Sequence, residues 1–268
     1  MSNNKVYKYF NFNRNEDGII YSLDALSHSY VYAAPPSLFN DPFDCAVQAE
    51  LDLTPLVLRN YYQSREMPKE EIEARLAYYF DEGDHLTKAG YAEQESFKKQ
   101  ISSMNQVLGV TCFSKQPYNP LMWAHYANNH NGYCLEFELG APFETKRIDD
   151  GVGLHIYGDV DYATNGKLPK VSLSDFLHGT VKTLDLILQK GRRWIYEEES
   201  RLIVTVETEN DRKINYHPDL LKGIYYGINI QPELKTQLEE LVNKHYSHVD
   251  RYDMKVSDQY YWMDKTPL

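Results

Sequence analysis

Short apolar runs, bounded by Gly, Pro, Asn or Asp, recur along the whole chain of 268 residues. Such runs are typical of strands, because the flanking residues favour turns and the run itself is too short for most helices. The runs that we predict as strands are Val6–Phe10, Tyr30–Ala34, Gly109–Phe113, Tyr133–Leu139, His155–Tyr162, Ser200–Val206, Gly223–Ile228 and Tyr252–Val256. The stretch Ile19–Leu26 fits either a short strand or the start of a helix.

Segments with helical periodicity lie between these runs. The polar block of about 54–107 reads as a helical insertion that contains three helices, at Pro55–Arg65, Pro68–Phe80 and Ala92–Val107. Three more helices are predicted after it: one capped by Asn119 and ending near Asn128, one over Leu173–Lys190, and one that begins at Gln231-Pro232. The pattern predicts a single α+β domain, 1–268, with a mixed or mostly antiparallel sheet.

Composition excludes several classes of protein. A formal net charge of -11 argues against a general duplex nucleic-acid binder, which needs a basic face. The three cysteines, Cys45, Cys112 and Cys134, have no CxxC spacing, so we predict neither a disulfide framework nor a zinc site. The lack of a disulfide framework fits a cytoplasmic location. No apolar run is long enough for a membrane span. Neither GxGxxG nor GxxxxGK[ST] occurs, which disfavours kinases, P-loop NTPases and standard dehydrogenases.

The first candidate site is the acidic segment that ends in Arg201. If this segment is extended, alternation places Glu197, Glu199 and Arg201 on one face and Glu198 on the other. Two carboxylates on one face repel each other, and a nearby Arg relieves the repulsion. A carboxylate so placed can act as a general base or stabilise a developing cation. The plain alternative is a solvated acidic turn in which Arg201 pairs with one glutamate.

Two further candidates come earlier in the chain. The predicted helix after Asn119 carries Trp123, His125 and Tyr126, of which His125 can serve as an acid, a base or a hydrogen-bond donor to a phosphate. The alternative is a histidine that fixes the helix to the sheet. Ser114 ends a predicted strand and can bond a ribose or orient a glutamate, but no nucleophile elbow surrounds it, which disfavours a serine hydrolase.

With these residues laid out, the chain resembles a bacterial family, domain of unknown function 2971, whose name carries no function. The matching segments are Val6–Tyr9, Leu38–Asp44, Cys112–Ser114, Leu121–Ala127, Gly132–Phe137 and Lys190–Arg201. Together they span nearly the whole chain and leave out the helical block of 54–107.

A weaker resemblance is to the ADP-ribosyltransferase fold. That fold uses an Arg, His or Tyr on a first strand, a hydroxyl on a middle strand and a late Glu. The corresponding residues here are Tyr7 or Tyr9 with Lys8, then Ser114, then Glu197 or Glu199. The first strand lacks Arg and His, and Cys112-Phe113-Ser114 stands in place of Ser-Thr-Ser. The resemblance implies NAD as a substrate.

The chemistry that this resemblance implies is coherent. A fixed carboxylate stabilises the positive charge that develops on ribose as NAD is cleaved. Tyr7 or Tyr9 would stack on nicotinamide, and Arg201 or Lys8 would lie near the pyrophosphate. The residues expected to bind the nucleotide are Tyr7, Lys8, Tyr9, Asn40, Asp41, Trp123, Tyr126, Trp194 and Arg201; those expected to be catalytic are Ser114, His125, Glu197 and Glu199.

Two other hypotheses about function stay open. One is a non-catalytic ligand-binding or regulatory module, with a pocket formed by Asn40, Asp41 and the Trp123–Tyr126 helix. The other is a phosphate-processing enzyme in which Asp41, Glu197 and Glu199 hold a divalent ion, since carboxylates suit Mg²⁺. Residue pattern alone does not choose among the three.

Overall fold

The computed structural model of this chain describes residues 5–138, 155–179 and 186–268. Its contacts divide it into two compact units. We call residues 1–35, 108–162 and 192–268 the sheet unit, and residues 36–107 and 163–191 the helical unit. Each unit draws on separate stretches of the chain. That the chain behaves as a single domain stays a prediction.

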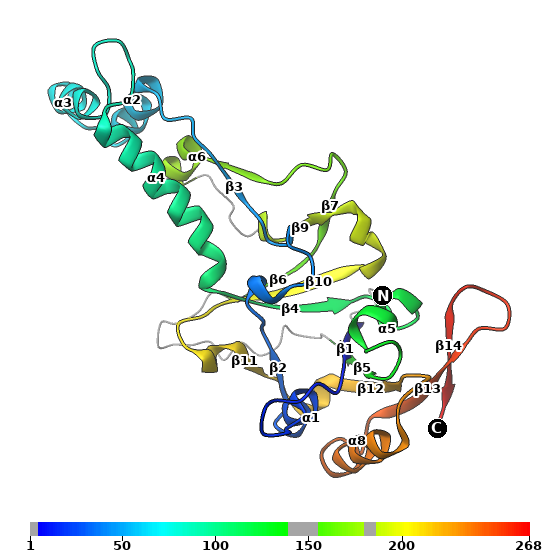
Figure 1. The fold of residues 1–268 in the computed structure, drawn as a ribbon. Helices are drawn as coiled ribbons and strands as arrows, with labels where there is room; N and C mark the ends of the chain where they lie inside the picture. The colour runs from blue at the N-terminus through cyan, green and yellow to red at the C-terminus, as the bar shows by residue number, and fades with distance from the viewer. Residues whose placement is uncertain (1–4, 139–154, 180–185) are drawn as a thin grey trace. The chain divides into compact units, whose positions relative to one another are not determined.

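The sheet unit is built on an eight-stranded sheet with the order β14-β13-β12-β5-β1-β4-β10-β6 (Figure 1). Neighbouring strands are antiparallel, apart from the parallel pair β12 and β13. The fold is therefore α+β with a mixed, mostly antiparallel sheet, as predicted. The strands are β1 (Lys5–Phe10), β4 (Leu108–Ser114), β5 (Tyr133–Glu138), β6 (His155–Asp159), β10 (Glu199–Thr205), β12 (Leu221–Tyr226), β13 (Asp250–Val256) and β14 (Met263–Pro267).

The two faces of this sheet differ in chemistry, because successive side chains of a strand point to opposite sides. One face carries Val6, Phe113 and Leu135, and the helices α1 (Tyr21–Ser27) and α8 (Pro232–His245) pack against it through Leu26, Leu238 and Val242 to form the main apolar core. The other face is rich in tyrosine and acids, and the short helix α5 (Pro120–Tyr126) covers part of it. Candidate residues gather on this second face.

Helix α5 forms where the sequence predicts it. The Asn119 side chain accepts a hydrogen bond from the Leu121 N–H at 2.9 Å, and Pro120 occupies the first turn, where its missing N–H costs nothing. Trp123 is fully buried against Tyr9, and its Nε1 donates to the Pro117 carbonyl at 2.6 Å. This packing anchors the helix to β1.

Shorter elements complete the sheet unit. They are β2 (Tyr30–Tyr32), β11 (Lys213–Asn215), η3 (Arg192–Glu197), η4 (Glu209–Arg212) and η5 (Pro218–Leu220). Strand β7 (Asp161–Ala163) spans the point where the chain passes from one unit to the other.

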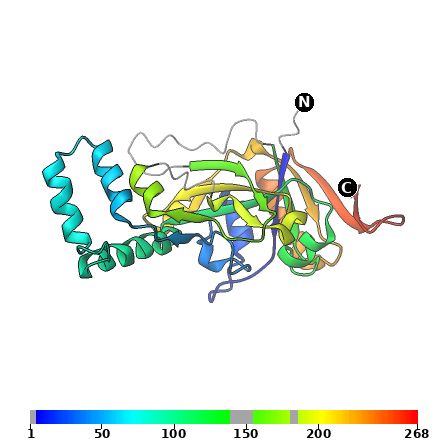
Figure 2. The same cartoon turned by 90° about the horizontal axis from the view of Figure 1, so that it is seen from above.

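The helical unit contains the three helices predicted for the block of 54–107. Figure 2 shows α2 (Pro55–Ser64), α3 (Lys69–Tyr79) and α4 (Lys88–Ser103), whose apolar faces share one core. The unit also contains η1 (Pro36–Leu38), β3 (Gln48–Glu50), η2 (Met104–Gln106), β8 (Lys170–Ser172), α6 (Leu173–His178) and β9 (Gln189–Gly191). In the parts of the chain with described structure, no helix is long and apolar enough to span a membrane.

One predicted helix is wrong, and several short strands were not predicted. The helix predicted over Leu173–Lys190 is not continuous, because α6 ends at His178 and Gly179 adopts a left-handed φ of 67° that caps it. Val181 and Leu184, which completed its apolar stripe, lie outside the described residues, as does Leu139 of the strand predicted over Tyr133–Leu139. Strand β14 was missed altogether, since its polar sequence MDKTP has no apolar alternation.

Gly132 precedes β5 at a point where two backbones nearly touch. A Cβ at this position would lie 1.9 Å from the Phe10 carbonyl oxygen, so only glycine fits without displacing β1. Its N–H donates to the Ala127 carbonyl at 2.8 Å, which ties the turn after α5 to β5.

Gly132→Ala is expected to lower the free energy of unfolding by about 2 kcal/mol or more, because the backbone must shift to relieve the contact. Urea denaturation at constant m-value measures the change. Gly223→Ala in β12 is the matched control, because its added Cβ would meet nothing closer than a Tyr225 ring carbon at 3.3 Å. Equal losses in the two variants would contradict this account.

Candidate functional site

Three residues from distant parts of the chain lie in one row across adjacent strands. Tyr7 of β1 pairs with Ser114 of β4, and Ser114 pairs with Glu199 of β10. Directly paired residues of neighbouring strands point to the same face of the sheet. The register therefore places an aromatic ring, a hydroxyl and a carboxylate side by side, on the polar face.

Glu199 forms a buried ion pair with Arg201. Arg201 Nε donates to Glu199 Oε1 at 2.8 Å and its Nη2 donates to Oε2 at 3.1 Å. Glu199 is 3% exposed and Arg201 is fully buried. A bidentate pair of this kind compensates the cost of burying both charges. It fixes the orientation of the Glu199 carboxylate.

Cys112 lies beside this ion pair, because it pairs with Arg201 across β4 and β10. Burial raises the pKa of the Cys112 thiol well above its usual value, and the charge of Glu199 adds to the effect. A thiol held in its neutral form is a poor nucleophile. Cys112 therefore belongs to the packing around the carboxylate.

Glu197 reaches the polar face by a different route from the one predicted. The segment is not extended: η3 runs to Glu197, and Glu198 then adopts a left-handed φ of 45° before β10 begins at Glu199. The condition for simple alternation, an extended segment, is therefore not met before Glu199. The turn nevertheless buries Glu197 and Glu199 and leaves Glu198 exposed. The Tyr126 hydroxyl donates a short hydrogen bond to Glu197 Oε1.

The loop after Ser114 links the row to α5. The carbonyl of Gln116 accepts hydrogen bonds from Ser114 Oγ at 3.1 Å and from the Tyr9 hydroxyl at 3.0 Å. Burial raises the pKa of Tyr7, and the neighbouring charge of Glu136 raises it further, so the phenol stays protonated. Ser114 and Tyr7 are 1% and 6% exposed, so the row is covered.

A cluster of rings lies beside Glu197 and reaches solvent. The ring centroid of His125 lies 6.2 Å from that of Tyr126, 6.4 Å from that of Trp194 and 6.3 Å from that of Tyr196. We call these four residues the ring cluster. His125 is exposed, whereas the other three are half-buried. The predicted residues of α5 and of the acidic segment are thus brought together.

Lys8 lies on the opposite face of the sheet from the row. Its Nζ sits over the rings of Phe10 and Phe113 and donates to the Cys112 carbonyl at 3.2 Å. Burial lowers the pKa of Lys8. The alternation of β1 therefore separates Lys8 from Tyr7 and Tyr9.

Asn40 and Asp41 belong to the helical unit. Asn40 is exposed, whereas Asp41 is 8% exposed and its Oδ1 accepts the Phe43 N–H at 2.9 Å, as expected for a turn-forming Asp. Within the described ranges, no group of three or more His, Cys, Asp and Glu side chains is placed to hold a metal ion.

Sequence reasoning missed a second polar cluster on the same face. Glu136 is 4% exposed, accepts a short hydrogen bond from the Tyr225 hydroxyl and pairs with Lys5 at 2.6 Å. Lys265 Nζ donates to that same hydroxyl at 3.3 Å and lies 3.8 Å from the Tyr252 ring centroid. The one available signal was an acid inside the apolar run YCLEFEL.

One family model, which has no function attached to it, matches part of the chain. The family model described as "Protein of unknown function (DUF2971)" matches residues 122–202, which include the ring cluster, Glu197, Glu199 and Arg201. This match supports the resemblance to that family. No curated protein and no solved structure matches the chain.

Arg201→Met is expected to lower the free energy of unfolding by about 3–5 kcal/mol, because Glu199 is left buried without a counter-charge. The double variant Glu199→Gln, Arg201→Met removes both charges. Its free energy of unfolding is expected to fall by less than that of Arg201→Met alone. Urea denaturation at pH 7 measures both. A double variant as unstable as the sum of the two single changes would show that the pair is not coupled.

Proposed function

We propose that this chain is an ADP-ribosyltransferase-like enzyme that binds NAD on the polar face of its sheet and cleaves the bond to nicotinamide. The single observation that supports it most is the register Tyr7–Ser114–Glu199. The resemblance requires an aromatic or basic residue, a hydroxyl and a glutamate from three strands in that chain order. Here the three strands are adjacent and their residues are paired.

Each residue of the row has a role in this reaction. Glu199 carries a fixed negative charge beside the ribose, where positive charge develops as the glycosidic bond breaks. Nicotinamide leaves with the bonding electron pair, and water or a target nucleophile forms the new bond to the same ribose carbon and releases a proton. Ser114 orients the ribose or the carboxylate by its hydroxyl, and Tyr7 provides a ring for nicotinamide.

The ring cluster supplies the second half of the binding site in this proposal. His125 and Trp194 reach solvent in this cluster, and base or nicotinamide rings stack on such side chains. Glu199 is 3% exposed, so NAD has to displace covering side chains to reach it. The hydrogen bond from Tyr126 to Glu197 joins α5, which carries part of the cluster, to the acidic turn.

A second candidate function is a ligand-binding module without catalysis. It is favoured by the pairing of both Glu199 oxygens with Arg201, which leaves the carboxylate already satisfied. In that case the ring cluster binds a ligand, and the buried acids serve the fold.

Hydrolysis of NAD by the full chain tests the first proposal. Native protein is expected to release nicotinamide, and Glu199→Gln, which keeps the shape of the side chain, is expected to lower the rate by about 10²–10³. Ser114→Ala removes only a hydroxyl and is expected to lower it by about tenfold. Chromatography of released nicotinamide gives the rate.

Glu198→Gln is the matched control, because it removes an adjacent exposed charge outside the row and is expected to keep the native rate. Circular dichroism checks that each variant is folded. If folded native protein binds NAD in calorimetry but releases no nicotinamide, the chain is a ligand-binding module and the catalytic proposal fails. If it shows no affinity for NAD, the nucleotide proposal fails.

A further inference from the structure

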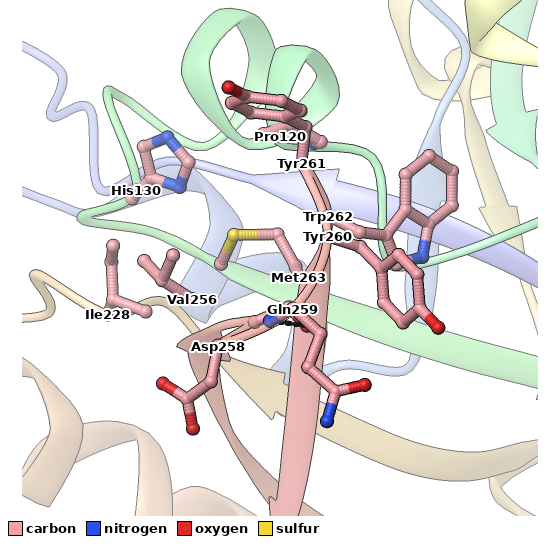
Figure 3. Close-up of a pocket in the computed structure, with 11 residues that line it drawn as sticks. Pro120, His130, Ile228, Val256, Asp258, Gln259, Tyr260, Tyr261, Trp262 and Met263 are labelled. Atoms are coloured by element: carbon pink, nitrogen blue, oxygen red, sulfur yellow. Dashed lines mark hydrogen bonds between the residues drawn. The ribbon is translucent and has the colours of Figure 1, made fainter.

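A cavity of about 600 Å³ lies at the tip of the hairpin formed by β13 and β14 (Figure 3). That volume is in the range of small-molecule sites. Its lining comes from the hairpin tip and from three residues elsewhere in the sheet unit, Pro120, His130 and Ile228. None of the residues predicted for the nucleotide site lines it.

The walls of this cavity are mostly apolar and aromatic. In Figure 3 His130, Val256 and Ile228 lie on one side of the Met263 side chain, and the rings of Tyr260 and Trp262 lie on the other. The tip leaves its rings open to solvent: Tyr260 is 73% exposed and Tyr261 fully so. Large aromatic side chains that remain exposed together mark binding surfaces. Ring surfaces of this kind favour planar aromatic ligands.

The tip is nevertheless held in place by the backbone. Ser257 N–H donates to the Trp262 carbonyl at 3.1 Å, which closes the hairpin. Met263 N–H donates to the Tyr118 carbonyl at 3.0 Å, which fixes the hairpin to the segment before α5. The aromatic walls are therefore presented by an ordered turn.

His130 brings an unused hydrogen-bonding group to the cavity. Its Nδ1 is buried and has no hydrogen-bond partner, and no side-chain hydrogen bond of His130 is made within the described residues. Burial lowers the pKa of His130, so the ring is uncharged at neutral pH. A neutral imidazole offers one donor and one acceptor, so the His130 ring can bond the polar edge of a ligand in the cavity.

The charge of the lining selects against anions. Asp258 is the single charged residue among the eleven that line the cavity, since His130 is neutral. Its carboxylate would repel a phosphate held within a few ångströms. A nucleotide is thereby disfavoured, whereas an uncharged heterocycle is not.

We propose that this hairpin cavity is a second ligand site, which takes a small planar heteroaromatic molecule without negative charge, in the class of a nucleobase or nucleoside. Tyr261 provides the stacking surface, His130 bonds the polar edge of the ring, and Asp258 excludes phosphorylated forms. The site is independent of the nucleotide site proposed above, and it stands whether or not the chain cleaves NAD.

Calorimetric titration of the full chain with adenosine, and separately with AMP, tests the site. Adenosine is expected to bind saturably, and AMP about tenfold more weakly. Tyr261→Ala is expected to weaken adenosine binding by about tenfold, since stacking on one aromatic ring supplies an energy of that order. His130→Phe keeps a ring and removes its nitrogens, and is expected to weaken binding by about fivefold. Asp258→Asn is expected to raise the affinity for AMP until it is close to the affinity for adenosine.

Tyr91→Ala is the control, because Tyr91 is 61% exposed on α4 of the helical unit and should leave adenosine binding unchanged. The proposal is overturned if adenosine gives no saturable heat, if Tyr261→Ala binds it as well as native protein, or if AMP binds native protein as tightly as adenosine. Self-association that Tyr261→Ala abolishes, without adenosine binding, would also overturn it and assign the tip to a second copy of the chain.

Discussion

The backbone pairing of β4 with both of its neighbours is the constraint on which the candidate site depends. Ser114 pairs with Tyr7 on one side and with Glu199 on the other, and the hydrogen bonds of the two ladders hold that register. A slip of one residue in either ladder would turn the side chains of that strand to the apolar face. The apolar core on that face, which includes Phe113 and Leu202, opposes such a slip.

Each buried glutamate near the row on the polar face has a hydrogen-bonding partner that compensates its burial. Glu199 is neutralised by Arg201, and Glu197 is held by the Tyr126 hydroxyl. Each buried acid has its partner in the immediate surroundings, as burial of a charge requires. The outcome is a fixed array of carboxylates under the half-buried ring cluster. Such an array suits electrostatic stabilisation of a cation, and it equally suits a rigid binding surface.

Much of the fold could be predicted from the sequence, because strand and helix periodicities are local properties. The helix after Asn119 and the three helices of the block of 54–107 form close to the predicted places. Predictions of secondary structure failed where one residue ends a periodic pattern or where pairing with another strand, and not the pattern, forms the element. Gly179 interrupts a helix whose apolar stripe looked continuous, and the polar strand β14 forms by pairing with β13.

The sequence by itself determined the identity of the candidate groups, the α+β class and the family resemblance, because these depend on residue type and short-range spacing. Only the tertiary structure decided which residues lie next to the candidate groups. It separated Lys8 from Tyr7, turned Glu197 inward through the left-handed Glu198, and built a cavity around His130 from the hairpin tip. The physical reason is that register, burial and partner choice arise from contacts between residues far apart in the chain, which no local pattern specifies.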